Sequence, residues 1–425
     1  MEIYTVKPGD TVSSIAARFG VSRQRLIMEN GLQMPDALVP GQSLVILTPE
    51  VTHTAMAGET LFGIAQNYGT TVGALLRNNP YLTSQPLRAG QEIVISYTDK
   101  PTDMMRINGY AYPYISRELL RYELPFLSTL TIFGYGFMPD GELIEPDDVP
   151  LIEDANEFGV ASILLLSSVT ENGTFSSERA RQLFNTPSLQ EQVLTELADV
   201  MDEKGYRGLD IDFEYVNEAD TEAFLGFIRR SSEIMHSRGY FVNVDLAPKA
   251  SADQRGLLYE AHDYPQIGAL ADTVLLMTYE WGYTYGPPMA VAPLNQVERI
   301  VRYGVSEIPT DKIMMGVPNY GYDWPLPFEK GITKARSIGN EEAVLIASEN
   351  RADIEYDALS ESPFFIYSAA DRAHEVWFED ARSIEAKLAL AERYDLLGLG
   401  YWNLMRPFNA NWSILAANVI PTVVR

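Results

Sequence analysis

Eight short apolar runs recur through the last three quarters of the chain, and helical or polar stretches separate each run from the next. Continuous apolar runs are typical of strands buried on both faces, as in a parallel sheet covered by helices. Eight such units in roughly 320 residues fit a closed (β/α)8 TIM barrel better than an open doubly wound sheet. We therefore expect an α/β barrel. The runs lie at residues 107–112, 130–137, 161–169, 208–215, 241–247, 273–279, 313–320 and 396–402.

The spacing of these runs also predicts the domain boundaries. The barrel is expected to occupy residues 104–425. The seventh and eighth runs are the farthest apart, which predicts a small inserted subdomain at about residues 326–373. Residues 98–103, TDKPTD, are expected to form a short linker to the preceding part of the chain.

The fourth run carries an unusual set of side chains. Residues 207–215 read RGLDIDFEY, and strand alternation places Asp210, Asp212 and Glu214 on one face. Barrel interiors are normally filled with Val, Ile and Leu, so three carboxylates there point to chemistry. An exposed edge strand is the alternative, but the apolar opposite face and the central position count against it. Glu214, nearest the mouth, is the natural proton donor, and Asp212 lies behind it.

At this point the chain resembles glycoside hydrolase family 18, the chitinase-type barrels. Segment 207–215 is similar to the family's DGxDxDxE signature. Three further segments resemble its motifs on the sixth, seventh and eighth strands: MTYEW at 277–281, GVPNYG at 316–321 and GYWN at 400–403. The chain departs from the family pattern at Arg207, where the leading Asp is usual, at Glu280, which replaces Asp, and at Ser167 and Ser168.

The resemblance implies a retaining mechanism in which the substrate's own 2-acetamido group is the nucleophile. Glu214 is then the acid, Asp212 holds the acetamide N–H, Asp210 tunes the proton shared with Asp212, and Tyr279 bonds the acetamide carbonyl. Trp402 is expected to form the floor under the sugar. The complete set of expected substrate-binding residues is Trp402, Trp281, Glu280, Tyr320 and Tyr110.

The first hundred residues contain an internal repeat at an offset of 49 residues. Each copy has a short β-rich segment, a turn of Gly, an acidic residue and Thr, a helical pattern, a second short helix and a closing strand. The repeat predicts two small βααβ modules, at residues 1–48 and 51–97, each closing its own core. A structural dimerisation or spacer element remains an alternative to a binding role.

The modules resemble LysM domains, because residues 4–11 read YTVKPGDT and are followed by the family's later motifs. The second copy departs from the opening pattern, with HTAMA at residues 53–57. The resemblance implies that the modules bind glycans containing N-acetylglucosamine, between the first turn and the loop after the second helix. The residues implied are Gly9, Asp10, Thr11 and Asn30, and Gly58, Glu59, Thr60 and Asn79.

Composition excludes several classes of function. The chain has 58 Asp and Glu against 32 Lys and Arg, for a formal charge of -26, so nucleic acid is not an expected partner. No cysteine is present, and the four histidines show no ligand spacing, so neither a metal site nor a cofactor is expected. No apolar stretch is long enough for a membrane span, and the N-terminus lacks a signal-peptide pattern. We expect no membrane partner and a monomer.

Two LysM-like modules before a family 18 barrel resemble the spore cortical-fragment-lytic N-acetylglucosaminidases of endospore-forming bacteria. This implies that the substrate is peptidoglycan, cleaved at the β-1,4 bond that follows N-acetylglucosamine, and that the protein acts in the spore coat or cortex. Deposition from the surrounding mother cell would explain a missing secretion signal. Two alternatives remain: a chitinase or chitooligosaccharide hydrolase with the same machinery, and a non-catalytic glycan-binding coat protein.

Overall fold

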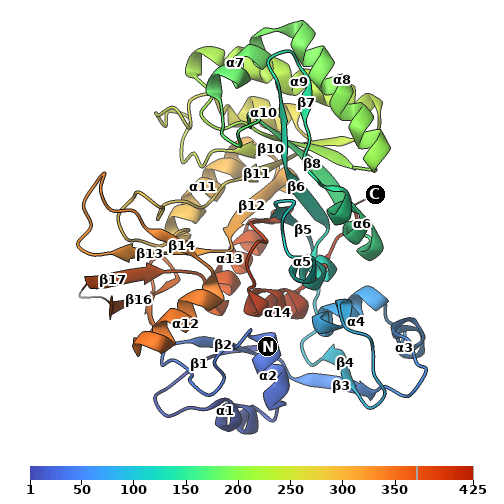
Figure 1. Cartoon of the computed structure of the whole chain (residues 1–425), viewed down its shortest axis with the longest axis vertical. Helices are drawn as coiled ribbons and strands as arrows, with labels where there is room; N and C mark the ends of the chain where they lie inside the picture. Colours follow the sequence, from blue (N-terminus) through green and yellow to red (C-terminus); the bar gives the residue numbers. More distant parts are fainter. Residues whose placement is uncertain (370–371, 425) are drawn as a thin grey trace.

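A computed structural model describes residues 1–369 and 372–424. Eight parallel strands form a closed barrel in the centre of the molecule (Figure 1). The first strand pairs with both the second and the last, which closes the sheet. The predicted barrel is therefore confirmed, with a strand in each of the eight runs. The strands are β5 (Asp103–Ala111), β6 (Thr129–Phe137), β8 (Ala161–Ser167), β9 (Gly208–Asp212), β10 (Phe241–Leu246), β11 (Thr273–Leu276), β12 (Ile313–Pro318) and β18 (Gly398–Trp402).

Helices cover the outside of the barrel, and α11 (Leu294–Glu307) shows the apolar stripe that packs such a helix on the strands. In this helix, Val297, Ile300, Val301 and Gly304 are buried, which is the spacing of a single helix face. The other helices around the barrel are α5 (Arg117–Glu123), α6 (Val149–Phe158), α7 (Ser177–Asn185), α8 (Pro187–Lys204), α9 (Thr221–Ser237), α10 (Tyr264–Leu270), α13 (Ala381–Arg393) and α14 (Asn409–Asn418). Among the described residues, no helix combines the length and apolar character needed to cross a bilayer.

Two short strands extend the barrel sheet, β7 (Leu143–Ile144) beside β6 and β19 (Val419–Pro421) beside β5. Short 3-10 helices occur at Leu124–Phe126, Glu218–Asp220 and Thr310–Lys312.

An antiparallel sheet is inserted between β12 and β18 and projects to one side of the barrel (Figure 1). It extends a few residues beyond the expected range of 326–373 on both sides. Its strands are β13 (Gly321–Pro325), β14 (Arg336–Ile338), β15 (Glu355–Asp357), β16 (Ser362–Ala369) and β17 (Arg372–Trp377), and α12 (Asn340–Asn350) packs on them. This insertion has a small apolar core of its own, to which Val39 of the first N-terminal module contributes.

Both N-terminal modules adopt the predicted βααβ fold. The first contains β1 (Glu2–Thr5), α1 (Val12–Phe19), α2 (Arg23–Glu29) and β2 (Ser43–Ile46); the second contains β3 (Pro49–Thr54), α3 (Leu61–Tyr68), α4 (Val72–Asn78), a 3-10 turn (Pro80–Thr83) and β4 (Glu92–Tyr97). Thr11 and Thr60 cap the first helix of each module, and Gly20 and Gly69 end it in the left-handed region. These local requirements explain why Thr and Gly recur at the offset of the repeat.

The two modules pack directly on the barrel rather than lying apart from it (Figure 1). The Ser413 hydroxyl of α14 donates to the Glu29 carbonyl at 2.7 Å, and the Asn409 side chain donates to the Met28 carbonyl at 2.8 Å. At the insertion, Ile354 N donates to the Pro40 carbonyl at 2.9 Å, and the backbone there leaves no room for a Cβ on Gly41. The sequence pattern did not predict this docking, because it depends on residues more than 300 positions apart.

Candidate active site

Two aspartates of β9 point into the barrel, as strand alternation predicts. Asp210 is 1% exposed and Asp212 is 9% exposed. Neighbouring β10 places Asn243 beside Asp210, and its side-chain amide donates to Asp210 Oδ1 at 2.7 Å. Asp212 Oδ1 is buried without a hydrogen-bond partner in the described structure. A buried polar atom left unsatisfied is costly, so this oxygen is available to a ligand that brings a donor.

A further buried carboxyl, Asp245 on β10, joins this cluster. The Asn243 amide also donates to Asp245 Oδ1 at 3.0 Å, and the Tyr110 hydroxyl donates to the same oxygen at 2.9 Å. The sequence analysis missed Asp245. The alternation of polar and apolar residues in 241–246, FVNVDL, places Asn243 and Asp245 on one strand face and could have revealed it.

Burial and mutual repulsion perturb all three carboxyls. Loss of hydration raises the pKa of Asp210 to about 6, although the hydrogen bond from Asn243 opposes that change. Burial and the charges of its neighbours raise the pKa values of Asp212 and Asp245 well above the ordinary range. Three carboxyls so close together in a low-dielectric interior cannot all be ionised, so the cluster shares protons near neutral pH.

Glu214 lies two residues beyond the end of β9, at the carboxyl-terminal mouth of the barrel, where its side chain is exposed. Crowding by the surrounding protein and the nearby charge of Glu280 raise the pKa of Glu214. A carboxyl with a raised pKa that substrate can reach suits a general acid. The next residue, Tyr215, has a φ of 55°, and backbone strain of this kind is frequent at functional sites.

Glu280 also lies at the mouth, with a φ of 68°. Its carboxylate accepts a hydrogen bond from the Tyr320 hydroxyl and another from the Tyr322 hydroxyl, the latter at 3.0 Å. Tyr279 beside it is buried, and burial together with the surrounding carboxylates raises the pKa of its hydroxyl well above the ordinary range. Gly316 on β12 is needed here, because a Cβ would approach the Tyr279 ring to 2.7 Å.

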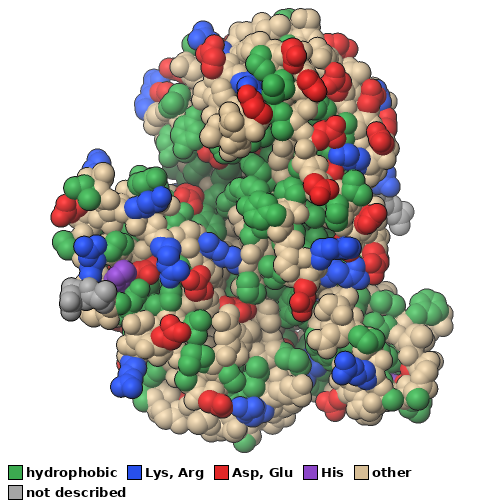
Figure 2. Space-filling model, viewed as in Figure 1, with side chains coloured by type: hydrophobic (Ala, Val, Ile, Leu, Met, Phe, Trp, Pro, Cys, Tyr) green, Lys and Arg blue, Asp and Glu red, His purple; other side chains and the backbone are tan. Residues whose placement is uncertain are grey.

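Aromatic rings surround the half-buried Trp402 at the end of β18. Tyr112, Phe133 and Tyr110 each meet its ring edge-on, with centroids 6.0, 5.8 and 5.7 Å away. The Trp402 ring also lines a cavity that Tyr320 and Glu280 border. A second, larger cavity is bordered by Glu214, Tyr279, Glu280 and Trp281. Figure 2 shows hydrophobic side chains gathered in a hollow between the barrel and the inserted sheet.

Tyr110 lies deeper than the other expected substrate-binding residues. Tyr110 is completely buried beneath Trp402, and its hydroxyl is engaged by Asp245. Its ring therefore supports the site from below. The other expected residues, Trp402, Trp281, Glu280 and Tyr320, all border one of the two cavities.

The first turns of the two modules use their acidic residues internally. Asp10 Oδ2 accepts from the Lys7 N–H at 2.8 Å and from the Tyr4 hydroxyl at 2.7 Å. Glu59 Oε2 takes the same place in the second module, accepting from the Met56 N–H at 2.7 Å and bonding His53 at 2.8 Å. Gly9 and Gly58 have φ values of 89° and 87°, which explains the Gly-acidic-Thr pattern. Histidine in the second opening thus replaces tyrosine as the partner of the acid.

The side chains of Asn30 and Asn79, two of the residues expected at the glycan groove, make hydrogen bonds inside their modules. Both amides are buried, and each forms a pair of hydrogen bonds with one residue of the last strand of its module. Asn30 bonds the N–H and the carbonyl of Val45, and Asn79 bonds those of Val94. Each also donates to a carbonyl four residues earlier. These asparagines hold the second helix of each module to its sheet.

Comparison with known families identifies the barrel. The model described as glycosyl hydrolases family 18 matches residues 165–406. The chain belongs to glycosyl hydrolase family 18. The LysM domain model matches residues 4–47 and 53–96, so both predicted resemblances are confirmed.

Several relatives resemble the chain over its whole length. The cortical fragment-lytic enzyme of Bacillus subtilis (strain 168) is 38% identical over 425 residues, covering 98% of this chain and 97% of the relative. The putative sporulation-specific glycosylase YdhD of the same organism is 33% identical over 411 residues, covering 96% of each. The crystal structure of the Bacillus megaterium QM B1551 spore cortex-lytic enzyme SleL superposes with a TM-score of 0.83 at 36% identity, covering 99% of this chain and 98% of that chain.

As a member of family 18, the chain is a glycoside hydrolase. The chain retains the three carboxylates of the expected signature despite Arg207, and the segments expected on the sixth, seventh and eighth strands lie on or directly after β11, β12 and β18. The longer Glu280, where the family pattern has Asp, reaches hydroxyls on both Tyr320 and Tyr322. A family 18 barrel and two LysM domains are thus joined in one packed molecule.

Proposed function

We propose that this family 18 enzyme is an N-acetylglucosaminidase that hydrolyses spore-cortex peptidoglycan at the β-1,4 bond following N-acetylglucosamine. The observation that carries the proposal is the similarity to a cortical fragment-lytic enzyme over 98% of the chain, LysM modules and barrel together. The buried carboxyl cluster below an exposed Glu214 supports it from the chemistry of the site. The protein would then act in the spore of an endospore-forming bacterium.

In the proposed mechanism, Glu214 donates its proton to the glycosidic oxygen as the bond to the anomeric carbon breaks. The carbonyl oxygen of the sugar's own 2-acetamido group attacks that carbon from the opposite face and forms an oxazolinium ion. Water, deprotonated by the Glu214 carboxylate, then opens the ring with overall retention of configuration. This route is an exception to the scheme in which an enzyme carboxylate is the nucleophile.

The buried cluster supplies what this route requires. Asp212 Oδ1 lacks a partner and can accept the acetamide N–H, which orients the acetamide oxygen toward the anomeric carbon. Negative charge on Asp212 offsets the positive charge that develops on the oxazolinium ring. Asp210, whose pKa is raised to about 6, can take up a proton shared with Asp212 during the cycle. Tyr279 donates to the acetamide oxygen, and Trp402 packs against the apolar face of the ring.

The LysM modules are proposed to hold the polymer through backbone and side-chain groups of the exposed first turns. Gly9, Thr11, Gly58 and Thr60 are exposed, unlike the two asparagines. The modules and the barrel are in fixed contact, so a bound strand would be held at a defined distance from the cleft.

Mass spectrometry of reducing ends tests the proposed activity directly. Purified spore-cortex fragments are incubated with wild type and with Glu214→Gln, and we expect products ending in reducing N-acetylglucosamine with wild type alone. Products ending in reducing muramic acid would overturn the bond specificity. Equal product formation by Glu214→Gln would overturn the role of the acid.

Hydrolysis of chitin oligosaccharides is the second candidate function. The proposed machinery requires an N-acetyl group only on the sugar whose bond is broken, and two cavities lie on the two sides of Glu280 at the mouth. Cleavage of chitin oligomers without cleavage of cortex fragments would favour this activity over the first.

A further inference from the structure

Arg406 lies four residues beyond β18 and borders the same cavity as the Trp402 ring. It is partly buried, and its guanidinium is held by the inserted sheet. Nη1 donates to Ser337 Oγ at 2.9 Å, and Nη2 donates to the Ser337 carbonyl at 3.2 Å. These two bonds fix the plane of the guanidinium beside the cleft. Neither bond neutralises its charge.

Arg406 forms no ion pair with a carboxylate among residues 1–369 and 372–424. By contrast Arg336, on the same strand as Ser337, is paired with Glu342 at 2.6 Å. A guanidinium has five N–H donors, and the two bonds to Ser337 leave three for a ligand. Burial lowers the pKa of Arg406, and the nearby charge of Glu342 only partly opposes that change. Such a site favours a planar anion, above all a carboxylate.

The two cavities can be assigned to the two sides of the scissile bond. Glu214 and Tyr279 both border the larger cavity, so in the proposed mechanism the scissile bond and the acetamide group lie at its edge, and the leaving part of the substrate extends into it. The Trp402 floor lies in the other cavity, which therefore receives the sugar bearing the 2-acetamido nucleophile and the sugars that precede it. Arg406 consequently lies on the side of the preceding sugars.

We propose that Arg406 binds a carboxylate carried by the sugar immediately before the N-acetylglucosamine whose bond is broken. This inference rests on the proposed function. Peptidoglycan alternates its two sugars, so that preceding sugar is a muramic acid, whose 3-O-lactyl arm ends in a free carboxylate or in a short peptide that has one. Chitin offers no anion at this position, and neither does a muramic lactam. Arg406 thereby makes the enzyme selective for acidic muramoyl glycans.

The test measures kcat/KM of wild type and Arg406→Gln on four soluble glycans of equal length. One carries the free lactyl carboxylate, one a muramoyl-L-alanine, one the uncharged lactam, and one is the chitin oligomer. We expect Arg406→Gln to lower kcat/KM by about 10- to 100-fold on a carboxylate-bearing glycan, the range for a hydrogen-bonded charged group. On the lactam and chitin oligomers a fall of about 3-fold or less is expected, because no ion pair is lost. Of the two carboxylate-bearing glycans, the one whose kcat/KM falls more in Arg406→Gln carries the anion that Arg406 binds.

Three variants distinguish recognition of the substrate's charge from a structural change in the inserted sheet. Arg406→Lys keeps the charge and should recover part of the preference for carboxylate-bearing glycans. Ser337→Ala removes one bond that holds Arg406, and Arg336→Gln removes a neighbouring cation that already has a partner. Both should alter the ratio of acidic to neutral substrates far less than Arg406→Gln.

An equal loss on all four glycans in Arg406→Gln would overturn the proposal and assign Arg406 to support of the sheet. A wild type that prefers the lactam would overturn it as well. Failure of the proposed peptidoglycan activity would give a different result. In that case wild type would cleave the chitin oligomer and none of the three muramoyl glycans.

Discussion

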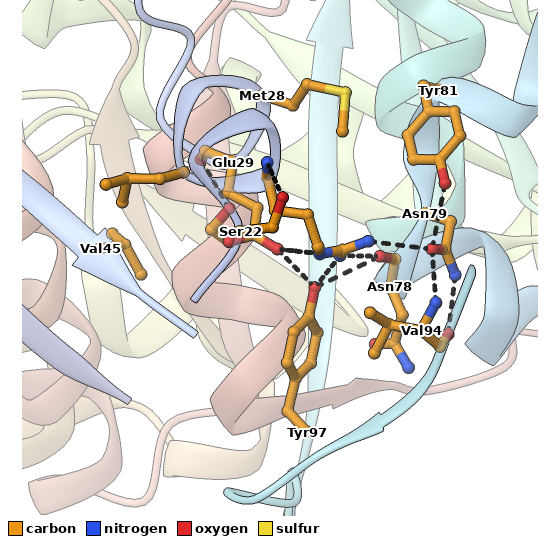
Figure 3. A network of polar contacts seen from close by, with 12 residues as sticks. Ser22, Met28, Glu29, Val45, Asn78, Asn79, Tyr81, Val94 and Tyr97 are labelled. Atoms are coloured by element: carbon orange, nitrogen blue, oxygen red, sulfur yellow. Dashed lines mark hydrogen bonds and ion pairs between the residues drawn. The ribbon is translucent and has the colours of Figure 1, made fainter. Parts of the chain in front are cut away.

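Two buried polar clusters of this protein differ in how their charges are compensated. In the barrel, Asp210, Asp212 and Asp245 are buried together, and among the residues that the structure describes none pairs with a cation and Asp212 Oδ1 has no hydrogen-bond partner. At the junction of the two modules, Glu29 is paired with Arg25 at 2.8 Å and accepts from the Tyr97 hydroxyl at 2.9 Å (Figure 3). The first cluster thus has an oxygen that can accept a hydrogen bond from a ligand. In the second cluster, Glu29 already has a counter-ion and a hydrogen-bond donor within the protein.

The junction cluster connects both modules through one arginine. The Arg25 guanidinium of α2 also donates to the Asn78 carbonyl at 2.9 Å and to Asn79 Oδ1 at 3.4 Å, both in the second module. Burial raises the pKa of Glu29, although Arg25 and Tyr97 oppose that change. Both clusters are buried, so burial of charge alone does not identify a functional site. Incomplete compensation of that charge is the informative feature.

The largest expected effect is the loss of hydrolysis on substitution of Glu214 at the mouth of the barrel. Glu214→Gln removes the proposed proton donor, and we expect hydrolysis of soluble glycans to fall by about 10²- to 10⁴-fold, the usual contribution of a general acid. Thermal unfolding should be unchanged or slightly improved, because a negative charge is removed from a crowded acidic site. A variant that loses stability together with activity would contradict this separation of roles.

The same substitution in the junction cluster should have the opposite result. Glu29→Gln leaves Arg25 buried without its counter-ion, and breaking a buried pair in this way costs about 3–5 kcal/mol of unfolding free energy. Activity on short soluble glycans should remain close to that of wild type under conditions where the protein is folded. Urea unfolding measures the first quantity. The double variant Arg25→Met with Glu29→Met is the control, and it should recover most of the loss because neither charge is left alone.

A smaller effect, on the pH dependence of activity, is expected from substitution of Glu280. The charge of Glu280 helps to raise the pKa of Glu214, so Glu280→Gln should lower that pKa. The acid must be protonated to act, and kcat/KM falls as pH rises through its pKa. The alkaline limb of the profile should therefore move to lower pH in Glu280→Gln. An unmoved limb would show that the raised pKa has another source.

The smallest expected effect concerns Glu341 of α12, which lies between the inserted sheet and the first module. It accepts from Asn409 N at 2.9 Å, and burial raises its pKa to about 7. Because the folded state holds the proton more tightly, its contribution to stability is complete below about pH 4.5 and is lost as pH rises through about 7. Glu341→Gln should flatten the fall of the melting temperature across this window. A parallel fall in wild type and variant would assign the pH dependence to other groups.

The barrel's helices and strands could be predicted because their signals are local. Apolar runs located all eight strands, and alternation with a period of two placed Asp210 and Asp212 on the inward face. The repeat located both modules for the same reason, since caps at Thr11 and Thr60 and left-handed ends at Gly20 and Gly69 are requirements of single helices.

The sequence by itself thus determined the order of the elements, the family and the position of the Glu214 carboxyl at the barrel mouth. Only the tertiary structure decided that Asp245 joins Asp210, that Tyr110 lies beneath Trp402, and that Arg406 faces the cleft. It also decided that the asparagines of the modules are internal clamps and that the modules dock on α14. The physical reason is that these contacts join residues far apart in the chain, which closure of the barrel and burial of apolar surface bring together, and no local period records such pairings.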